Sequence, residues 1–218
     1  SDSLGLDSLG QGTTSQSSVS RFTYIPKAKG GWSEAAHNQV SFTSASLPKQ
    51  TAMAGTGSAD LWVAADAEDV DLQVTLSELR PDGQEMLVQS GWLRASHRAL
   101  DERTSTNLRP RQLHTATAQK NLVPGEWTQV RIELFPFAHV FREGSQIRLT
   151  ISGPGGAVNA WPWAFDARPG EFEVRIAHDN SEHSSSLVLP VVQPTDLSLP
   201  ASLPACDSVV LQPCRAIN

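Results

Sequence analysis

The chain has 218 residues, of which 39% are hydrophobic, and a net charge of −6. This length suits one large β domain or two small ones and leaves ample material for a hydrophobic core. The acidic balance argues against a nucleic-acid partner, which needs clustered basic residues, and the lack of any stretch near the ~20 apolar residues that cross a bilayer argues against a membrane partner.

Residues 1–36 are expected to form a linker and a leading segment. Residues 1–20 are rich in Ser, Gly and Thr and contain no basic residue, so they can bury little apolar surface. A proline and the Gly30-Gly31 pair then interrupt regular structure. The chain starts at Ser1 without a basic or an apolar signal region, so it is expected to be either a mature chain or a piece of a longer protein, and the piece is favoured.

Alternating hydrophobicity begins near residue 40 and predicts β-strands. Within VDLQVTLSEL, every second residue from Val70 to Leu76 is apolar, and the residues that alternate with them, up to Ser77, are polar. This period of two is typical of a half-buried strand. Asp82-Gly83 then favours a hairpin turn, because both residues tolerate a positive φ. The following stretch EMLVQSGWLRAS is expected to return antiparallel to the first.

The strand pattern resumes after one long interruption. Residues 97–122 are polar and show neither period, so they are expected to form a crossover loop with one helical turn. Further strands are predicted in PGEWTQVRIELFPF, SQIRLTISG, EFEVRIAH and SSLVLPVV. About eight short strands with turns between them predict an all-β fold, an antiparallel β-sandwich of the jelly-roll kind, over residues 37–192.

Residues 193–218 form a separate C-terminal tail that contains both cysteines of the chain, Cys206 and Cys214. Two thiols this close in sequence could close a small loop as a disulfide, which would imply export. The alternative is a pair of free thiols in a mobile tail. The disulfide is favoured because nothing nearby supplies other metal ligands or an activating base.

No catalytic residue, metal site or cofactor is predicted within the chain. The G-x-S-x-G elbow of an α/β-type serine hydrolase is absent, and so is the alternating β/α pattern that would carry it. None of the six histidines has a second ligand at zinc spacing. The acidic run DAEDVD, residues 66–71, could be a calcium site or a solvated turn. The turn is favoured, because the glycine and the terminal Glu of an EF-hand are missing.

The tryptophans fall into two groups. Trp62, Trp92 and Trp127 lie within strand patterns and are expected to pack in the sheets. Trp161 and Trp163 lie in the breaker-rich stretch GPGGAVNAWPWAF. There they would either contact a ligand, by stacking on a sugar ring or lining a cleft, or plug one end of the sandwich.

Four stretches occur in an order that resembles a known family: SFTSASL, GSADLWVAADAEDVDLQVTLSELRPDGQEMLVQSGWLRASHR, LVPGEWTQVRIELFPFAHVFREGSQIRLTISGPGG and SSLVLPVV. From about Phe22 to Val192 the chain resembles the C-terminal domain of the X-Pro dipeptidyl-peptidase and cocaine-esterase-like serine hydrolases, the CocE/NonD group. The resemblance implies a non-catalytic jelly roll of the galactose-binding-like type. It also implies a partner, the preceding α/β-hydrolase domain, which carries the Ser-Asp-His triad.

The resemblance implies a position for substrate contact as well. The family's jelly roll closes one side of the catalytic cleft, and the residues after a Gly-Gly pair face that cleft. Here those residues are Trp32 and Ser33. Two departures limit the comparison: Ser145 stands where the family commonly has histidine, and residues 193–218 have no family counterpart.

The basic stretch GWLRASHR could be a reactive site or part of the scaffold. It resembles the family's strand-end signature, which implies a scaffold. In that interpretation the tryptophan packs, and Arg94 and Arg98 pair with Asp69 or Asp71, since an arginine fork binds a carboxylate through two hydrogen bonds.

The first functional hypothesis is an accessory, non-catalytic domain of a secreted or periplasmic serine hydrolase that cleaves esters or amides. In this role the chain would form a wall of the active-site cleft, stabilise the catalytic domain and offer a surface for a homodimer. The second hypothesis is a carbohydrate-binding jelly roll that uses Trp161 and Trp163. The third is a purely structural domain held by the Cys206–Cys214 loop.

Overall fold

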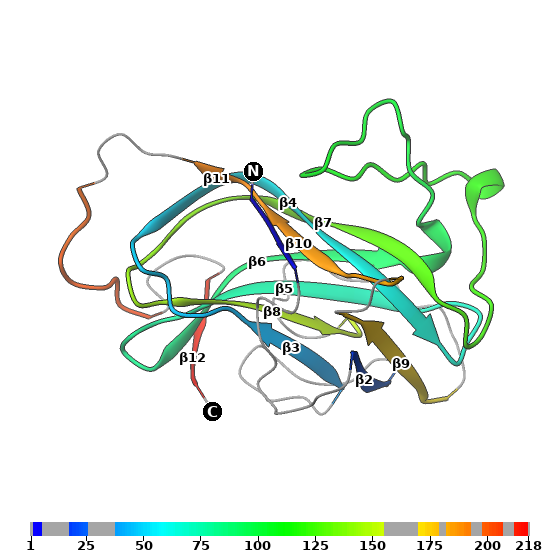
Figure 1. The fold of residues 1–218 in the computed structure, drawn as a ribbon, viewed down its shortest axis with the longest axis horizontal. Helices are drawn as coiled ribbons and strands as arrows, with labels where there is room; N and C mark the ends of the chain where they lie inside the picture. The colour runs from blue at the N-terminus through cyan, green and yellow to red at the C-terminus, as the bar shows by residue number, and fades with distance from the viewer. Residues whose placement is uncertain are drawn as a thin grey trace.

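The computed structural model describes the backbone of residues 2–5 and all atoms of residues 18–25, 38–154, 170–178, 182–192, 198–206 and 212–217. Two antiparallel β-sheets pack face to face (Figure 1). Among the described residues the only helical segments are two single 3-10 turns, η2 (Ala95–His97) and η3 (Ala116–Ala118). The prediction of an all-β antiparallel sandwich is confirmed, while the jelly-roll and galactose-binding-like assignments stay predictions.

The first sheet has seven strands and is organised around β4, the longest of them. Its path runs β1-β10-β4-β9-β2, and β7 and β11 also pair with β4. The strands are β1 (Asp2–Gly5), β2 (Val19–Tyr24), β4 (Thr51–Ala65), β7 (Thr128–Phe141), β9 (Phe172–Ala177), β10 (Ser186–Leu189) and β11 (Val191–Val192).

The second sheet has five strands in the order β12-β6-β5-β8-β3. The predicted hairpin is its centre, since β5 and β6 pair antiparallel and are joined by a turn in which Gly83 has a φ of +81°. The strands are β3 (Gln39–Thr43), β5 (Asp71–Leu79), β6 (Gln84–Arg94), β8 (Gln146–Ser152) and β12 (Cys214–Ala216).

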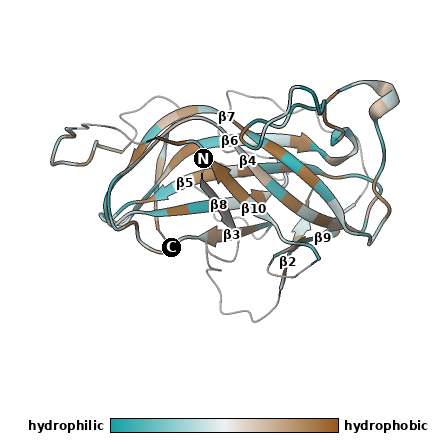
Figure 2. Ribbon diagram, turned by 45° about the horizontal axis from the view of Figure 1, so that its top comes forward, coloured by the Kyte–Doolittle hydropathy of each residue, from teal (hydrophilic) through white to brown (hydrophobic). Residues whose placement is uncertain are grey.

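The core lies between the sheets and is built from the alternating apolar residues. The alternation of hydrophobic and hydrophilic residues is visible along the long strands in Figure 2. Fully buried side chains come from both sheets, which confirms the predicted inward faces of the strands. The largest are Phe42, Phe141, Leu61, Leu72, Leu76, Ile132, Leu134, Leu149, Ile151 and Ile176.

Strand β5 is buried on both faces, so the prediction of a half-buried strand is wrong there. Its polar row is satisfied by hydrogen bonds to β6. Trp92 Nε1 donates to Gln73 Oε1 at 3.0 Å, and the hydroxyls of Thr75 and Ser90 lie 3.2 Å apart. Buried polar groups are tolerated when each has such a partner. Hydrophobic alternation alone could not show that the polar face is also covered.

The backbones of the two sheets approach each other closely where β6 faces β7. A Cβ atom added at Gly91 would lie 1.9 Å from the carbonyl oxygen of Glu133. Next to this contact, Trp92 packs against Phe135 with ring centroids 5.4 Å apart. Glycine is therefore required at position 91 because only a residue without a side chain allows the backbones to come this near.

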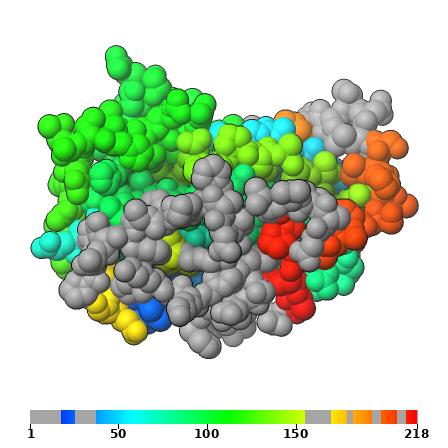
Figure 3. Space-filling model, turned by 180° about the vertical axis from the view of Figure 1, so that it is seen from behind, coloured from blue at the N-terminus to red at the C-terminus, as the bar shows by residue number. Residues whose placement is uncertain are grey.

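Both ends of the chain add strands to the sandwich. Residues 2–5 and 19–24, within the expected linker and leading segment, form β1 and β2 and pair with β10 and β9. Backbone pairing explains how the polar residues of β1 can do this, whereas β2 also buries Phe22 and Tyr24 in the core. At the other end, β12 from the tail pairs with β6. Figure 3 shows these C-terminal residues, in orange and red, against the β5–β6 hairpin.

The predicted crossover loop between β6 and β7 is present. It contains η2 and η3, and one isolated bridge joins Leu100 to Gln112. Arg131 of β7 donates to the carbonyl oxygens of Thr106 and Asn107 at 3.1 Å, which fastens the loop to the sheet. In Figure 1 the loop, in green, rises beside β7.

Candidate functional site

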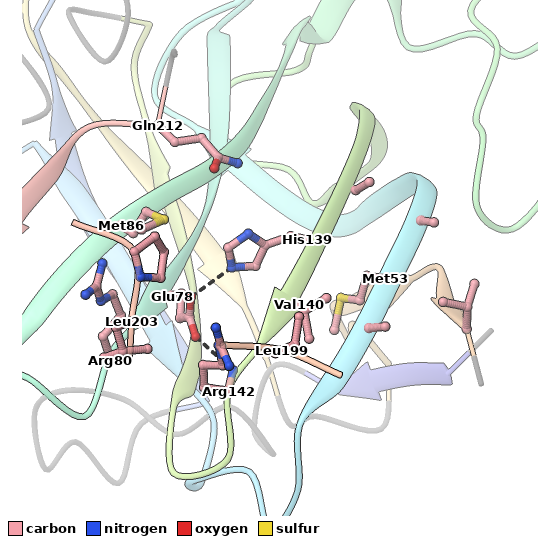
Figure 4. A pocket seen from close by; sticks show the side chains of 15 residues that line it. Met53, Glu78, Arg80, Met86, His139, Val140, Arg142, Leu199, Leu203 and Gln212 are labelled. Atoms are coloured by element: carbon pink, nitrogen blue, oxygen red, sulfur yellow. Dashed lines mark hydrogen bonds and ion pairs between the residues drawn. The ribbon is translucent and has the colours of Figure 1, made fainter. Parts of the chain in front are cut away.

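The candidate site is a cavity of about 540 Å³ at the end of the sandwich where β4 begins and β7 ends. Both sheets and the C-terminal tail contribute to it, and Figure 4 shows Met53 and Met86 on opposite sides with Glu78 and His139 between them. The lining residues are Ala52, Met53, Ala54, Glu78, Arg80, Met86, Ala138, His139, Val140, Arg142, Val192, Leu199, Leu203, Pro204 and Gln212.

Glu78 is the buried acid at the base of this cavity. One of its oxygens, Oε2, lies 2.8 Å from His139 Nε2. The other, Oε1, accepts hydrogen bonds from the Ser145 hydroxyl at 2.7 Å and from the Arg142 backbone amide at 3.0 Å. Every bond comes from β7 or the turn after it, so Glu78 ties β5 of the second sheet to β7 of the first.

Local sequence explains why Ser145 reaches this acid. The residues after β7 form a tight turn, in which the Ser145 amide donates to the Arg142 carbonyl at 3.1 Å and Gly144 has a φ of +80°. This turn places Ser145 fully inside the protein. The resemblance described above implies a histidine at this position. A small hydroxyl there leaves room for Glu78 to accept all three bonds.

These hydrogen bonds determine the charge of Glu78. Burial alone would raise the pKa of this carboxyl group, but the hydrogen bonds from His139, Ser145 and the Arg142 amide outweigh burial and lower its pKa below 4.5. Glu78 is therefore ionised near neutral pH and acts as an acceptor only.

The Ser145, Glu78 and His139 side chains do not form a nucleophile relay. In a serine hydrolase the histidine lies between serine and acid, because it must take the proton of the hydroxyl group. Here the carboxylate lies between the other two, and the Ser145 hydroxyl donates to it. The three side chains thus link the two sheets through hydrogen bonds.

The basic side of the cavity is formed by Arg80 and Arg142. The Arg80 side chain is 3% exposed and pairs with Asp82 through Nη2. Its Nη1 lies 3.7 Å from the Cys206 sulfur, and its buried Nε has no hydrogen-bond partner among the described residues. Arg142 donates through Nη1 to the carbonyl oxygen of Pro200 at 3.0 Å.

The tail forms one wall of the cavity and is held by two kinds of bond. Cys206 and Cys214 are joined by a disulfide, with Cα atoms 5.4 Å apart. Arg215 then donates to the buried Glu85 at 2.8 Å, where Arg148 also donates at 3.0 Å. The close spacing of the two cysteines in the sequence could suggest the disulfide. No residue pattern in the tail predicted that it would pair with β6.

The basic stretch GWLRASHR is part of the scaffold, as the resemblance implied. Arg94 binds Asp71 through both Nε and Nη2, at 2.7 and 3.1 Å. Asp69 instead accepts the backbone amides of Val70 and Ser96. Arg98 interacts electrostatically with Asp69, as expected, while its Nη1 donates to the carbonyl oxygens of Ala95 and Lys120.

Four expected ligand-contacting residues lie outside the described part of the structure: Trp32, Ser33, Trp161 and Trp163. The strands that flank them are described. Tyr24, at the end of β2, stacks on Phe172, at the start of β9, with ring centroids 4.7 Å apart. Within the described residues there is no cluster of three metal-binding side chains and no helix long and apolar enough to span a membrane.

Residues 3–188 match the model of the X-Pro dipeptidyl-peptidase C-terminal non-catalytic domain. The chain belongs to this family. Proteins named as candidate serine esterases in Mycobacterium bovis and Mycobacterium tuberculosis are 27% identical to it over 157 residues. The matched region is 71% of this chain and 24% of each relative, so this family domain spans about a quarter of their length.

Solved structures of the same fold come from larger hydrolases. A CocE/NonD family hydrolase from Staphylococcus aureus is 24% identical, with a TM-score of 0.66 over 88% of this chain and 36% of its own. An aminopeptidase from a marine sediment archaeon, Thaumarchaeota archaeon, is 13% identical, with a TM-score of 0.62 over 88% and 36% of the two chains. At these identities the likeness shows the fold, and the family domain again covers about a third of each protein.

Proposed function

We propose that this chain is the accessory part of a larger CocE/NonD-type serine hydrolase, in which it forms one wall of the active-site cleft and stabilises the α/β-hydrolase domain. The observation that carries the proposal is the family match over residues 3–188. In the parent enzyme, acyl-enzyme chemistry on an ester or an amide, such as an X-Pro dipeptide bond, would take place on the catalytic domain.

The edge formed by β2, β3, β8 and β9 supports the cleft-wall role. Because β2 pairs with β9 and β3 with β8, the segment with Trp32 and the segment with Trp161 both begin and end at this edge. The edge is tightly packed, since a Cβ atom added at Gly153 would lie 3.0 Å from the Tyr24 ring. We place Trp32 and Ser33 in the wall, where an indole would favour apolar acyl or aromatic groups.

The first test is an activity assay on this chain alone. Incubation with p-nitrophenyl butyrate and with Ala-Pro-p-nitroanilide is expected to give no turnover above the rate in buffer. Turnover that a serine-directed phosphonate abolishes would contradict an accessory role, because it would require a nucleophile within these residues.

The second test addresses the wall and uses the parent enzyme. Trp32→Ala is expected to raise KM for substrates with aromatic or long acyl groups by about tenfold, as a lost apolar contact of 1–2 kcal/mol implies. Trp32→Phe should recover most of this loss because it restores an aromatic surface. An unchanged KM in Trp32→Ala, with the unfolding temperature also unchanged, would place Trp32 away from the cleft.

We further propose that the parent enzyme works outside the cytoplasm, as a secreted or periplasmic protein. The bond between Cys206 and Cys214 supports this location, since disulfides persist in oxidising compartments and are rare in the cytosol. Labelling of free thiols in protein from its native source, before any reductant is added, is expected to modify neither cysteine. Full labelling of both would refute the proposed location.

A further inference from the structure

We propose that the cavity between the C-terminal tail and the sandwich binds a single-chain, medium-length carboxylate. The apolar chain would lie along the two methionines, and the carboxylate would lie at Arg80 and Arg142. This inference goes beyond the proposed function, because the cavity and the proposed cleft wall lie at opposite ends of β4. The cavity lies at the Thr51 end. The edge with Tyr24 is next to the opposite, Ala65 end of that strand.

The walls of the cavity suit a flexible apolar chain. Met53 from β4 and Met86 from β6 are the only two methionines of the protein, and both line this one cavity. Methionine side chains adapt their shape to an apolar guest more readily than branched ones. Leu199 and Leu203 of the tail complete the apolar lining. The volume, about 540 Å³, falls within the range of about 300–1,000 Å³ for small-molecule sites.

The polar side of the cavity selects a negative head group. Among the described lining residues Glu78 is the only carboxylate, and its oxygens already accept three hydrogen bonds. Arg80 keeps a buried Nε–H without an acceptor, and Arg142 has no carboxylate partner among the described residues. Since Arg80 is paired with Asp82, the guanidinium that lacks a carboxylate partner within the described part of the cavity is Arg142.

A carboxylate meets these requirements better than the other single-chain head groups. It accepts hydrogen bonds only, and arginine binds it through charge-assisted N–H donors. An alcohol would satisfy the Arg80 donor but leave the charge of Arg142 without an anionic partner. A quaternary ammonium head has no N–H acceptor site to offer Arg80 and would place a positive charge beside Arg142, which has no carboxylate partner among the described residues.

The test uses the full chain with ¹³C-methyl-labelled methionine, so that both NMR signals report on the cavity. Titration with decanoate is expected to shift both signals in a saturable way. Each added methylene in the series hexanoate, octanoate, decanoate should lower Kd roughly fourfold, as about 0.8 kcal/mol per buried CH₂ implies. Decanol should bind at least fivefold more weakly than decanoate, and decyltrimethylammonium should leave both signals unchanged.

Two substitutions locate the binding site. Ala138→Trp fills the cavity from an exposed position on β7 and is expected to weaken decanoate binding at least tenfold. Ala116→Trp, on the exposed turn η3 outside the lining, is the matched control and should bind as the unmodified chain does. Arg142→Gln should weaken decanoate but leave decanol unchanged.

Three results would overturn the proposal. They are the absence of a saturable shift with any carboxylate, equal binding of decanoate by Ala138→Trp and Ala116→Trp, and equal binding of decanoate and decyltrimethylammonium. Because the chain-length series needs no variant, a failure of Ala138→Trp to fold would not leave the proposal untested. None of these outcomes depends on whether the chain forms a wall of a catalytic cleft.

Discussion

His139 and Glu78 connect the two sheets across the base of the cavity, with Nε2 and Oε2 2.8 Å apart. The histidine side chain is 11% exposed and the glutamate side chain 4%. Each belongs to a different sheet, so the contact is a polar link between two layers whose shared core is apolar. A buried carboxylate is retained in such a place only when hydrogen bonds replace its lost water.

The lowered pKa of Glu78 predicts acid sensitivity. A carboxyl group whose pKa is lower in the folded than in the unfolded state stabilises the fold above its unfolded pKa, and this stability is lost as the pH falls through the folded value. We expect the free energy of unfolding to fall below about pH 4.5 in the unmodified chain and to fall less in Glu78→Gln. At pH 7, Glu78→Gln should cost about 1–3 kcal/mol. Urea unfolding at several pH values measures both effects.

The matched control for this prediction is Glu143→Gln, which removes an exposed carboxylate from the turn next to the same cavity. Its unfolding free energy should follow that of the unmodified chain at every pH. If Glu78→Gln and the unmodified chain lose stability in parallel on acidification, the link between Glu78 and the acid response is wrong.

The Arg94–Asp71 pair predicts a strong dependence of one residue on the other. Asp71 is 6% exposed at its side chain, so Arg94→Met leaves a buried, unpaired carboxylate and should cost about 3 kcal/mol. The double variant Arg94→Met/Asp71→Leu should recover at least half of that loss, because it removes the unpaired charge. Chemical denaturation of the two single variants and the double variant measures the coupling energy between the two residues. If the losses of unfolding free energy in the single variants simply add up in the double variant, the Arg94–Asp71 pair does not stabilise the fold.

The disulfide predicts that the tail detaches when it is reduced. Closing a loop of this length stabilises the folded state by about 2–3 kcal/mol. In Cys206→Ser/Cys214→Ser we expect the tail to open before the sandwich unfolds. Hydrogen exchange should then accelerate at Leu87, whose amide donates to the Pro213 carbonyl at 3.0 Å. Exchange at Val74, in the centre of the second sheet, is the internal control and should stay slow.

Gly91→Ala is expected to be among the most damaging single-methyl additions to this chain. The new Cβ would collide with the Glu133 carbonyl at 1.9 Å, and neither backbone can move without separating the sheets. We expect the unfolding free energy to fall by about 3 kcal/mol or more, which is the upper end of the range typical of overpacked cores. Gly83→Asn is the control, because it adds a side chain in open space at a φ that asparagine tolerates. Equal stability of the two variants would show that the sheets can separate at little cost.

Much of the architecture could be predicted because alternation reports directly on strands. The β5–β6 hairpin follows from VDLQVTLSEL, the Asp82-Gly83 turn and the return strand, and the structure pairs them as expected. The Arg94 scaffold role followed from the resemblance, since a strand-end arginine near acidic residues seeks a carboxylate. These features are local in sequence or are marked by a family motif.

The candidate cavity could not be predicted, because its residues come together only through long-range pairing. Glu78 and His139 are on strands of different sheets, and Leu203 belongs to a tail without a family counterpart. Nothing in the pattern around Met53 or Met86 marks them as neighbours. The sequence also gave no sign that residues 2–5 would pair with β10, since their side chains have no strand-like alternation.

The edge of β6 is closed by a strand that lies outside the family match. The match ends at residue 188, whereas β12 begins at Cys214 and pairs with β6 from Gln84 to Met86. A recombinant protein cut at residue 188 would present unpaired backbone groups there, a template onto which a second molecule could add a strand. Such a truncated protein is expected to form soluble clusters or to precipitate. We therefore expect the folding unit to extend to Ala216.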